Sequence, residues 1–571
     1  MSQGPRLILA FVFSILIMFV YYTYIDPPVS RQQTSHAQQN KQEQDAAVAA
    51  PDKTTTGEMV ASAQKKEPQT PPDQKDNNET TALTRDVPIE TMAAHVVLTT
   101  RGGMLTSYEL KNYRREANDN APFTNLLGDT AGSRALFMGL KGYSRFDRDK
   151  VFDLIKDEIL EDNTHRLHLL WQNSEIKIEK TITFGGLKTD YAAQVDYQIT
   201  NLSDHDLSIA PYLESEIRQK PMPKKDGGVL SFLKLQQPNI FYSELYKDQK
   251  LIANMNWDDF KGNQTEFGNI SWAAISERYF IVGMVLPTDS SQNVTVHFDR
   301  RDDFLIGQIR NQEITLSPGA KTTGEFIAYL GPKKLAELEA VGAFLEESVD
   351  YGWFSFLALP ILWLMTFLHG FIPSWGVVII ALTFIIKILL HPINKKSMQS
   401  MKGMQQLQPK LKEIKEKFAN DKEKQNKEVM QLFKTHKVNP MGGCLPLLLQ
   451  MPIYIVLYKV LWNAIELYHA PFLGVYKDLS APDPYFVAPI LLGVFMFLQQ
   501  KLTPAATVDP AQQKMMMFMP IMFTALMLFL PVGLVVYIFV NTVMSVIQQF
   551  MIKRDITFKQ LMMGRWQAKG A

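Results

Sequence analysis

The sequence predicts a multi-domain membrane protein in which an all-α bundle of six transmembrane helices carries a large antiparallel β-sandwich. Three observations support this fold class. Apolar residues crowd into positions 7–25 and 353–552 of the 571-residue chain. Residues 86–333 form short runs in which apolar and polar residues alternate, as they do in half-buried strands. Residues 26–85 contain no Phe, Trp or Tyr and separate the first apolar stretch from the alternating region.

Composition excludes several classes of site. The formal net charge is +1, so no global charge bias points to nucleic acid. Cys444 is the only cysteine, which excludes an intrachain disulfide, a cysteine zinc site and a CxxC redox pair. The alternating region shows no metal-ligand cluster, nucleophile motif or phosphate-binding loop. We therefore expect no cofactor, no metal and no enzymatic activity.

Residues 1–25 are expected to form an uncleaved signal-anchor helix. Arg6 is followed by 19 uncharged residues, which is long enough to span a membrane. Tyrosines stand where a cleavage site would need small residues. The following segment, 26–85, cannot bury enough apolar surface to offset its ordering entropy, so it is expected to be a disordered linker.

Residues 86–333 are expected to form the β-sandwich domain. Runs such as "HRLHLLWQNSEIKIEKTITF" alternate with period two and are bounded by Gly, Asn and Asp. Asp196 and Glu214 are expected to be solvated charges on strand faces rather than a catalytic pair. Residues 333–352 then predict one helix that leads back to the membrane.

Charge decides which of the later apolar blocks cross the membrane. The loop at 395–437 holds twelve lysines and five acidic residues, so the positive-inside rule places it in the cytoplasm. Arg6 places the N-terminus there too, and the β domain outside. An odd number of crossings must then join the β domain to the lysine-rich loop, so residues 353–369 are expected to lie flat at the outer interface.

The resulting organisation has both termini in the cytoplasm. A connecting and interfacial segment at 334–373 precedes a core at 374–552, which contains a cytoplasmic helical hairpin at 394–438 and is followed by a basic tail at 553–571. Pro531 and Gly533 divide the last apolar block in two. The expected spans of the core are 374–393, 441–462, 485–502, 515–530 and 534–552.

The cytoplasmic hairpin carries an apolar stripe with helical spacing. Its members recur every three or four residues and are Met398, Met401, Met404, Leu407, Leu411, Ile414 and Phe418. Two interpretations stay open: the two helices bury their own seam, or the stripe docks a partner. The lysines of the hairpin could also contact anionic lipid.

Lys387 lies inside the apolar run "LTFIIKILLHP". It would sit about 20 Å into the second span, where a lipid-facing lysine costs about 2.5–3.5 kcal/mol. Either its long stem carries the ammonium to the headgroups, or it lines a wet cavity open to the cytoplasm. Thr383 and His391 are each one turn away and share its face.

Polar residues in other spans could complete such a cavity. The third span carries Gln450 between Pro446 and Pro452, and the sixth carries Asn541, Thr542 and Ser545. Each could instead form an ordinary hydrogen bond between helices. The fifth span adds "KMMMFMP", an adaptable apolar lining. One cation, amides, hydroxyls and methionines together suit a polypeptide segment of varied sequence.

Several stretches resemble the YidC membrane protein insertases, whose relatives include mitochondrial oxidase-assembly and chloroplast thylakoid insertases. They are "TFIIKILLHP", "KVNPMGGCLPLLLQMPI", "DPYFVAPILLGVFMFLQQKLTP" and "DPAQQKMMMFMPIMF". The resemblance extends over nearly the whole chain, including the signal anchor and the lysine-rich hairpin.

The resemblance implies a function. It implies a periplasmic β-supersandwich at the inner membrane of a Gram-negative bacterium, with residues 26–352 periplasmic, and a hydrophilic groove open to the cytoplasm. The partners implied are nascent membrane proteins and the Sec translocon, with the ribosome or the signal recognition particle receptor at the hairpin and tail. Insertion would proceed alone or beside the translocon, without nucleotide hydrolysis.

The resemblance also implies site residues. The groove cation falls on Lys387, where family members typically have arginine; lysine keeps the charge but loses the planar fork of donors. Gln450 matches a groove glutamine, while Thr383, His391 and Asn541 match less closely. The apolar surface along which a substrate would slide is expected to comprise Cys444, Leu445, Pro446, Pro452, Met516 and Met519.

Two other functions are weighed against insertion. A secondary transporter would use Lys387 and His391 as a proton relay, but the chain shows no paired internal repeats. A membrane-anchored sugar-binding or sugar-modifying β domain would not need six spans.

Overall fold

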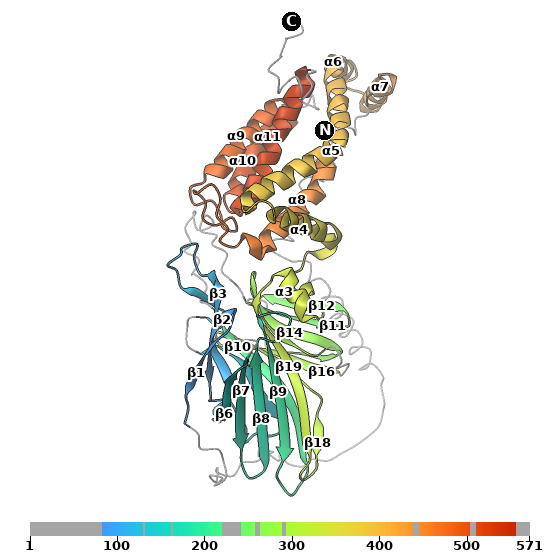
Figure 1. The fold of residues 1–571 in the computed structure, drawn as a ribbon. Coiled ribbons are helices and arrows are strands. Elements are labelled where there is room, and N and C mark those ends of the chain that lie inside the picture. The colour runs from blue at the N-terminus through green and yellow to red at the C-terminus, as the bar shows by residue number, and fades with distance from the viewer. Residues whose placement is uncertain are drawn as a thin grey trace, which may run out of the picture.

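The structure, a computed structural model, describes two parts of the chain (Figure 1). Nineteen described strands build a β domain, and helices α4–α11 form a bundle beside it. The described residues are 83–128, 132–160, 164–219, 241–256, 263–287, 293–436, 438, 445–502 and 510–554. The predicted signal anchor at 1–25, most of the linker at 26–85 and nearly all of the tail at 553–571 lie outside these ranges.

Antiparallel pairing joins the described strands into two sheets. One follows the order β1-β2-β3-β5-β10-β17-β16-β13, with β4 beside β3 and β18 beside β10. Its strands are β1 Asp86–Glu90, β2 Ala94–Thr99, β3 Met104–Arg114, β4 Phe123–Asn125, β5 Arg134–Lys141, β10 Leu207–Arg218, β13 Gln264–Gly268, β16 Val294–Arg301, β17 Phe304–Arg310 and β18 Ile314–Leu316.

The other sheet follows the order β12-β11-β14-β15-β19-β9-β8-β7-β6. Its strands are β6 Asp153–Ile159, β7 His165–Gln172, β8 Ile176–Phe184, β9 Ala192–Asn201, β11 Tyr242–Lys247, β12 Lys250–Asn256, β14 Ile270–Ser276, β15 Phe280–Val285 and β19 Lys321–Pro332. Along β8 every second side chain is buried, as a half-buried strand requires. The predicted antiparallel β domain is confirmed.

Glu214 differs from its expected role. It is 8% exposed on β10 and forms an ion pair with Arg148, whose Nη1 also lies 2.7 Å from Glu216 Oε2. The prediction of a solvated charge was wrong because alternation alone does not reveal a loop arginine that reaches over the strand.

The connection between the β domain and the bundle contains less helix than predicted. Helix α3 covers only Leu335–Val341, and two 3₁₀ turns follow at Leu345–Ser348 and Gly352–Phe354. Gly342, Ala343 and Phe344 all have positive φ, which ends the helix. The single helix expected over 333–352 was therefore wrong.

Helices of the bundle start and end near the predicted blocks, with one large difference. They are α4 Ser355–His369, α5 Trp375–Gln406, α6 Gln408–Lys417, α7 Lys422–Thr435, α8 Leu445–Asn463, α9 Val487–Leu502, α10 Pro510–Met527 and α11 Val532–Arg554. Helix α5 does not stop at residue 393 but continues through Pro392 to Gln406. It thus joins the predicted second span, 374–393, to the first arm of the hairpin.

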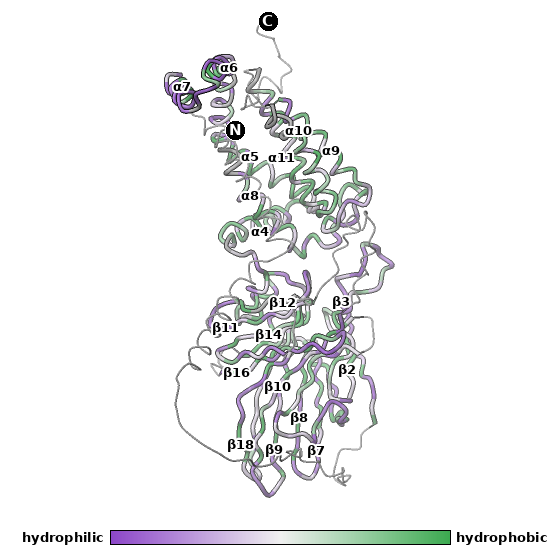
Figure 2. The backbone as a smooth tube through the Cα atoms, turned by 180° about the vertical axis from the view of Figure 1, so that it is seen from behind, coloured by the Kyte–Doolittle hydropathy of each residue, from purple (hydrophilic) through white to green (hydrophobic). Residues whose placement is uncertain are grey.

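Packing among the helices is uneven. α5 packs on α4, α8 and α11, α11 also packs on α9 and α8, and α10 packs on α9. Among the described helices, α5 and α11 are long and apolar enough to cross a membrane, and Figure 2 shows α8–α11 as mostly hydrophobic and α7 as mostly hydrophilic. The count of six spans stays a prediction, since only these two of the described helices meet that description and the predicted first span at 1–25 lies outside the described residues.

The lysine-rich hairpin formed by the end of α5, α6 and α7 buries part of its own stripe. Met404, Leu407 and Leu411 pack against Phe433 of α7. Leu407 separates α5 from α6, so the stripe lies on two helices rather than on one. This packing favours the interpretation in which the helices cover their own seam.

Candidate functional site

A chain of polar contacts runs between α5, α8 and α11. Lys387 on α5 is 8% exposed, and its Nζ lies 2.7 Å from Ser545 Oγ on α11. Ser545 Oγ in turn donates to Asn541 O at 2.8 Å. The lysine therefore points into the bundle toward a neighbouring helix.

The same chain continues from α11 to α8. Asn541 Nδ2 donates to Tyr454 OH at 2.6 Å, and Gln450 Nε2 donates to Tyr537 OH at 3.2 Å. The two tyrosine rings meet edge to face, with their centroids 5.9 Å apart. We call these six residues the polar cluster: Lys387, Gln450, Tyr454, Tyr537, Asn541 and Ser545.

Helical spacing explains how the sequence builds the polar cluster. Gln450 and Tyr454 are four residues apart on α8, and so are Tyr537, Asn541 and Ser545 on α11. Residues four apart share one face of a helix. Tyr454 and Tyr537 were missed by the sequence analysis, although this spacing from Gln450 and Asn541 could have identified them.

Thr383 and His391 lie apart from the hydrogen bonds of the polar cluster. Thr383 is 1% exposed, and its Oγ1 donates to Ile379 O of its own helix at 2.7 Å. His391 is exposed, with its Nδ1 3.0 Å from Gln548 Nε2. The shared face predicted for Thr383, Lys387 and His391 thus divides into two buried residues and an exposed one.

Residues expected to form the apolar slide are only partly described. Pro452 is half-buried on α8, and Met519 is 38% exposed on α10. Leu445, Pro446 and Met516 lie on helices, but the structure does not describe their side chains. Cys444 lies outside the described residues.

The electrostatic character of the polar cluster is set by Lys387. Its partner is a neutral hydroxyl, and the described residues form no ion pair between it and a carboxylate. A lysine ammonium has three N–H donors. The cluster therefore presents a positive charge with donor capacity beyond the one serine that it contacts, together with amide and phenol groups.

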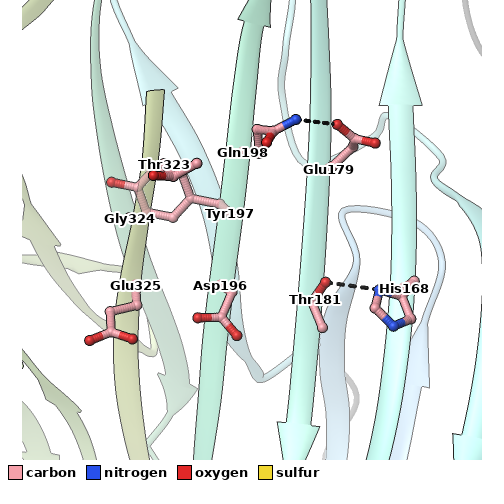
Figure 3. Close-up of a pocket in the computed structure, with 9 residues that line it drawn as sticks. All are labelled: His168, Glu179, Thr181, Asp196, Tyr197, Gln198, Thr323, Gly324 and Glu325. Atoms are coloured by element: carbon pink, nitrogen blue, oxygen red, sulfur yellow. Dashed lines mark hydrogen bonds between the residues drawn. The ribbon is translucent and has the colours of Figure 1, made fainter. Parts of the chain in front are cut away.

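A second polar site lies on the outer face of β7, β8, β9 and β19 (Figure 3). This depression has a volume of about 550 Å³. It is lined by His168, Glu179, Thr181, Asp196, Tyr197, Gln198, Thr323, Gly324 and Glu325. Gln194 Nε2 donates to Asp196 at 2.9 Å and to Glu325 at 3.1 Å, which bridges two carboxylates that face each other across strands.

One arrangement in this depression has the order of a hydrolytic triad. Thr181 Oγ1 lies 3.1 Å from His168 Nδ1, and His168 Nε2 lies 3.4 Å from Glu158 Oε1. Acyl transfer also needs free N–H donors for the developing oxyanion. Backbone N–H groups beside Thr181 are used in the ladders that β8 forms with β7 and β9. The geometry therefore does not favour catalysis here.

Comparisons with known proteins match both parts of the chain. The family described as "YidC periplasmic domain" matches residues 86–364, and the family described as "60Kd inner membrane protein" matches residues 367–560.

The similar proteins described here are all named as YidC insertases. "Membrane protein insertase YidC" from Geobacter sp. (strain M21) is 34% identical over 83% of this chain and 87% of its own length. The protein of that name from Actinobacillus pleuropneumoniae serotype 3 (strain JL03) is 33% identical over 85% of this chain and 88% of its own. A solved structure titled "Active YidC insertase crystal structure with the first transmembrane domain resolved" aligns with 83% of this chain at a TM-score of 0.35 and 16% identity.

Proposed function

Because this chain belongs to the YidC family of membrane protein insertases, we propose that it receives apolar segments of nascent proteins at the polar cluster and releases them into the lipid. Its homologues support membrane protein insertion as the activity. The finer steps given below are our proposal for this chain.

The observation that carries the proposal is the burial of Lys387 between helices, with one neutral partner among the described residues. An ionisable side chain inside a membrane marks a functional site by default. A cation without a carboxylate attracts acidic or polar groups of an incoming segment. Asn541, Gln450 and the two tyrosines add donors and acceptors, so a polar side chain would find partners halfway across the membrane.

The proposed topology follows from charge. The lysine-rich hairpin and the tail would be cytoplasmic, the β domain periplasmic and the chain anchored by six spans. Helix α4 would lie flat at the outer surface, because Phe356, Trp363 and Phe367 are exposed along one side of it. The groove that admits substrates would then open from the polar cluster toward the cytoplasm.

The proposed partners follow from the surfaces of the hairpin. Basic residues on α6 and α7 would contact anionic lipid headgroups, the ribosome or the signal recognition particle receptor. Cooperation with the Sec translocon would serve substrates whose insertion needs both this protein and the translocon. The proton-relay transporter is not favoured, because His391 contacts Gln548 rather than Lys387.

Insertion by the purified full chain in vesicles tests the proposal. Lys387→Ala should lower the yield of an inserted single-span substrate by tenfold or more, while Lys387→Arg should retain most of it because the positive charge remains. Lys501→Ala is the matched control, since this lysine is exposed at the end of α9. Equal insertion by wild type and Lys387→Ala would remove the charge from the mechanism.

A photo-crosslinker tests the place of the site independently. Placed at Gln450, it should capture a nascent membrane segment, since this residue faces Tyr537 across the polar cluster. A crosslinker at exposed Trp363 on α4 should capture lipid instead. Capture of nascent chains only at Trp363 would move the substrate path away from the polar cluster.

A further inference from the structure

The segment between α8 and α9, residues 464–486, belongs to two hydrophobic cores at once; we call it the outer hairpin. Ala464 and Leu467 are buried in the core of the bundle, while Ile465 is 3% exposed within the core of the β domain. Tyr468 packs against the β domain as well. Neighbouring residues of one short segment therefore hold two domains together.

Two side chains, Arg278 and Tyr468, attach the outer hairpin and the end of α8 to the β domain. Arg278, in the turn between β14 and β15, donates from Nε to Trp462 O at 2.8 Å, and its guanidinium carbon lies 3.8 Å from the centre of the Trp462 ring. Tyr468 OH donates to Arg114 O at 2.9 Å. The Tyr468 ring also contacts Tyr279 and Phe280, at centroid distances of 5.1 and 5.6 Å.

Arg278 is placed where a cation stabilises the end of a helix. Trp462 is the second-to-last residue of α8, so its carbonyl is among those that no later N–H of the helix satisfies. A positive charge there also interacts favourably with the helix dipole. The β domain thus supplies the cap of the helix that carries Gln450 and Tyr454.

The outer hairpin also fixes the first turns of other helices. Val532 and Gly533, at the start of α11, donate their backbone N–H groups to Ala481 O and Leu479 O at 2.8 and 2.9 Å. Asp483 Oδ2 accepts from the N–H of Ala488 in α9 at 2.7 Å. Gly376 in the first turn of α5 lies against the Phe472 ring so closely that a Cβ would not fit.

We propose that the outer hairpin is the element through which the β domain fixes the positions of α5, α8 and α11 around the polar cluster, with Arg278 and Tyr468 as positioning residues. All three helices of the cluster meet this hairpin at their outer ends, and the β domain holds it. The consequence for insertion rests on the proposed function, whereas the mechanical coupling does not.

Hydrogen exchange of the full chain in lipid nanodiscs tests the coupling. Arg278→Ala should speed exchange in the outer hairpin and at the amides of Val532 and Gly533 by about tenfold, which corresponds to about 1.4 kcal/mol of local stability. Arg278→Lys keeps the cation above Trp462 and should restore most of the protection. Arg145→Ala is the control, because this exposed arginine pairs with Glu175 on the β-domain surface.

Insertion yield is measured on the same variants. Arg278→Ala should lower it several-fold, with partial rescue by Arg278→Lys. Lys387→Ala should lower insertion and leave exchange at the outer hairpin unchanged, so full activity of that variant would count against the proposed function and not against the coupling. Faster exchange in Arg278→Ala with undiminished insertion would overturn the positioning role.

Fast hydrogen exchange within β8 and β9 would reveal that Arg278→Ala does not fold. A second variant, Tyr468→Phe, then tests the coupling by removing a single hydroxyl. Tyr468→Phe keeps the ring contacts and loses the hydrogen bond of the hydroxyl to Arg114 O, so exchange should rise about threefold. Unchanged exchange in both Tyr468→Phe and the Arg278→Lys/Tyr468→Phe double variant would overturn the proposal.

Discussion

The β domain and the helical bundle each bury lysines, but they surround them differently. In the β domain, Lys180 Nζ donates to Gly103 O at 2.7 Å and to Leu136 O at 2.6 Å. Lys333 Nζ contacts Glu244, Tyr242 OH and Ser348 O at 2.9, 2.9 and 3.1 Å. In the bundle, Lys387 contacts only Ser545 among the described residues.

Under the proposed function, this difference separates lysines that complete the core of the β domain from one that meets substrates. Two or three acceptors use most of the three donors of an ammonium, so Lys180 and Lys333 contribute to a fixed core. Lys387 has one acceptor among the described residues, so under the proposed function its remaining donors meet the incoming segment. Substituting each lysine by methionine, which is similar in length but uncharged, turns the comparison into a series of stability measurements.

The largest loss of stability is expected for Lys333→Met. The change leaves the Glu244 carboxylate buried at 1% side-chain exposure without its cation, and breaking one half of a buried ion pair costs about 3–5 kcal/mol. Thermal unfolding of the β domain within the full chain, followed by near-ultraviolet circular dichroism, measures this. Adding Glu244→Gln to Lys333→Met should recover part of the lost free energy of unfolding, because no buried carboxylate is then left unpaired. If Lys333→Met alone cost less than about 1 kcal/mol, Lys333 would contribute no more to stability than is expected of Lys387.

The next effect depends on pH. Burial lowers the pKa of Lys180 from its ordinary value of 10.5 to about 7. Between these values the unfolded chain binds the proton and the folded β domain does not, so the free energy of unfolding should rise with pH by up to about 1.4 kcal/mol per unit. Lys180→Met should remove this rise. Identical slopes for wild type and variant between pH 7 and 9 would contradict the assignment.

A smaller effect is expected for the polar cluster itself. Asn541→Ala removes the 2.6 Å hydrogen bond to Tyr454 OH, and hydrogen bonds between membrane helices contribute about 0.6 kcal/mol on average and about 1.7 at most. Unfolding of the bundle in mixed micelles measures the loss. Thr542→Ala is the matched control, since its hydroxyl donates to Ile538 O within α11 and, among the described residues, bonds to no other helix.

The smallest change in stability is expected for Lys387→Met. Removing a cation that has one neutral partner should change the free energy of unfolding of the bundle by less than about 1 kcal/mol, or stabilise it, while insertion falls. The same micelle unfolding and vesicle insertion assays measure both. If Lys387→Met lowered the free energy of unfolding by about 3 kcal/mol or more, as expected for Lys333→Met, Lys387 would have a structural role like that of Lys333.

The local sequence pattern predicted where most helices of the bundle lie, but not which side chains of different helices contact one another. The apolar blocks predicted the bounds of α8, α9 and α11 to within a few residues, because the apolar residues extend along nearly the whole length of each of these helices. Lys387 and Gln450 were identified as unusual residues in apolar surroundings. Their partners Ser545 and Tyr537 lie 158 and 87 residues away, and no local periodicity pairs residues at that distance.

Backbone details were harder to predict. Helix α5 continues through Pro392 although proline removes one backbone hydrogen bond, so the proline and the end of the apolar block did not mark the end of the helix. The helix predicted over 333–352 ends early because three successive residues adopt positive φ, two of them not glycine. Such conformations depend on packing against the β domain rather than on propensity.

The sequence by itself determined the division into an antiparallel β domain and an apolar helical region, the unusual position of Lys387 and the membership of an insertase family. These follow from the period of burial along each strand or helix and from the residues themselves. Only the tertiary structure decided which groups meet: Lys387 with Ser545, Asn541 with Tyr454, and Arg278 with the end of α8. Contacts between distant segments depend on how whole elements pack, and that information is shared among many side chains.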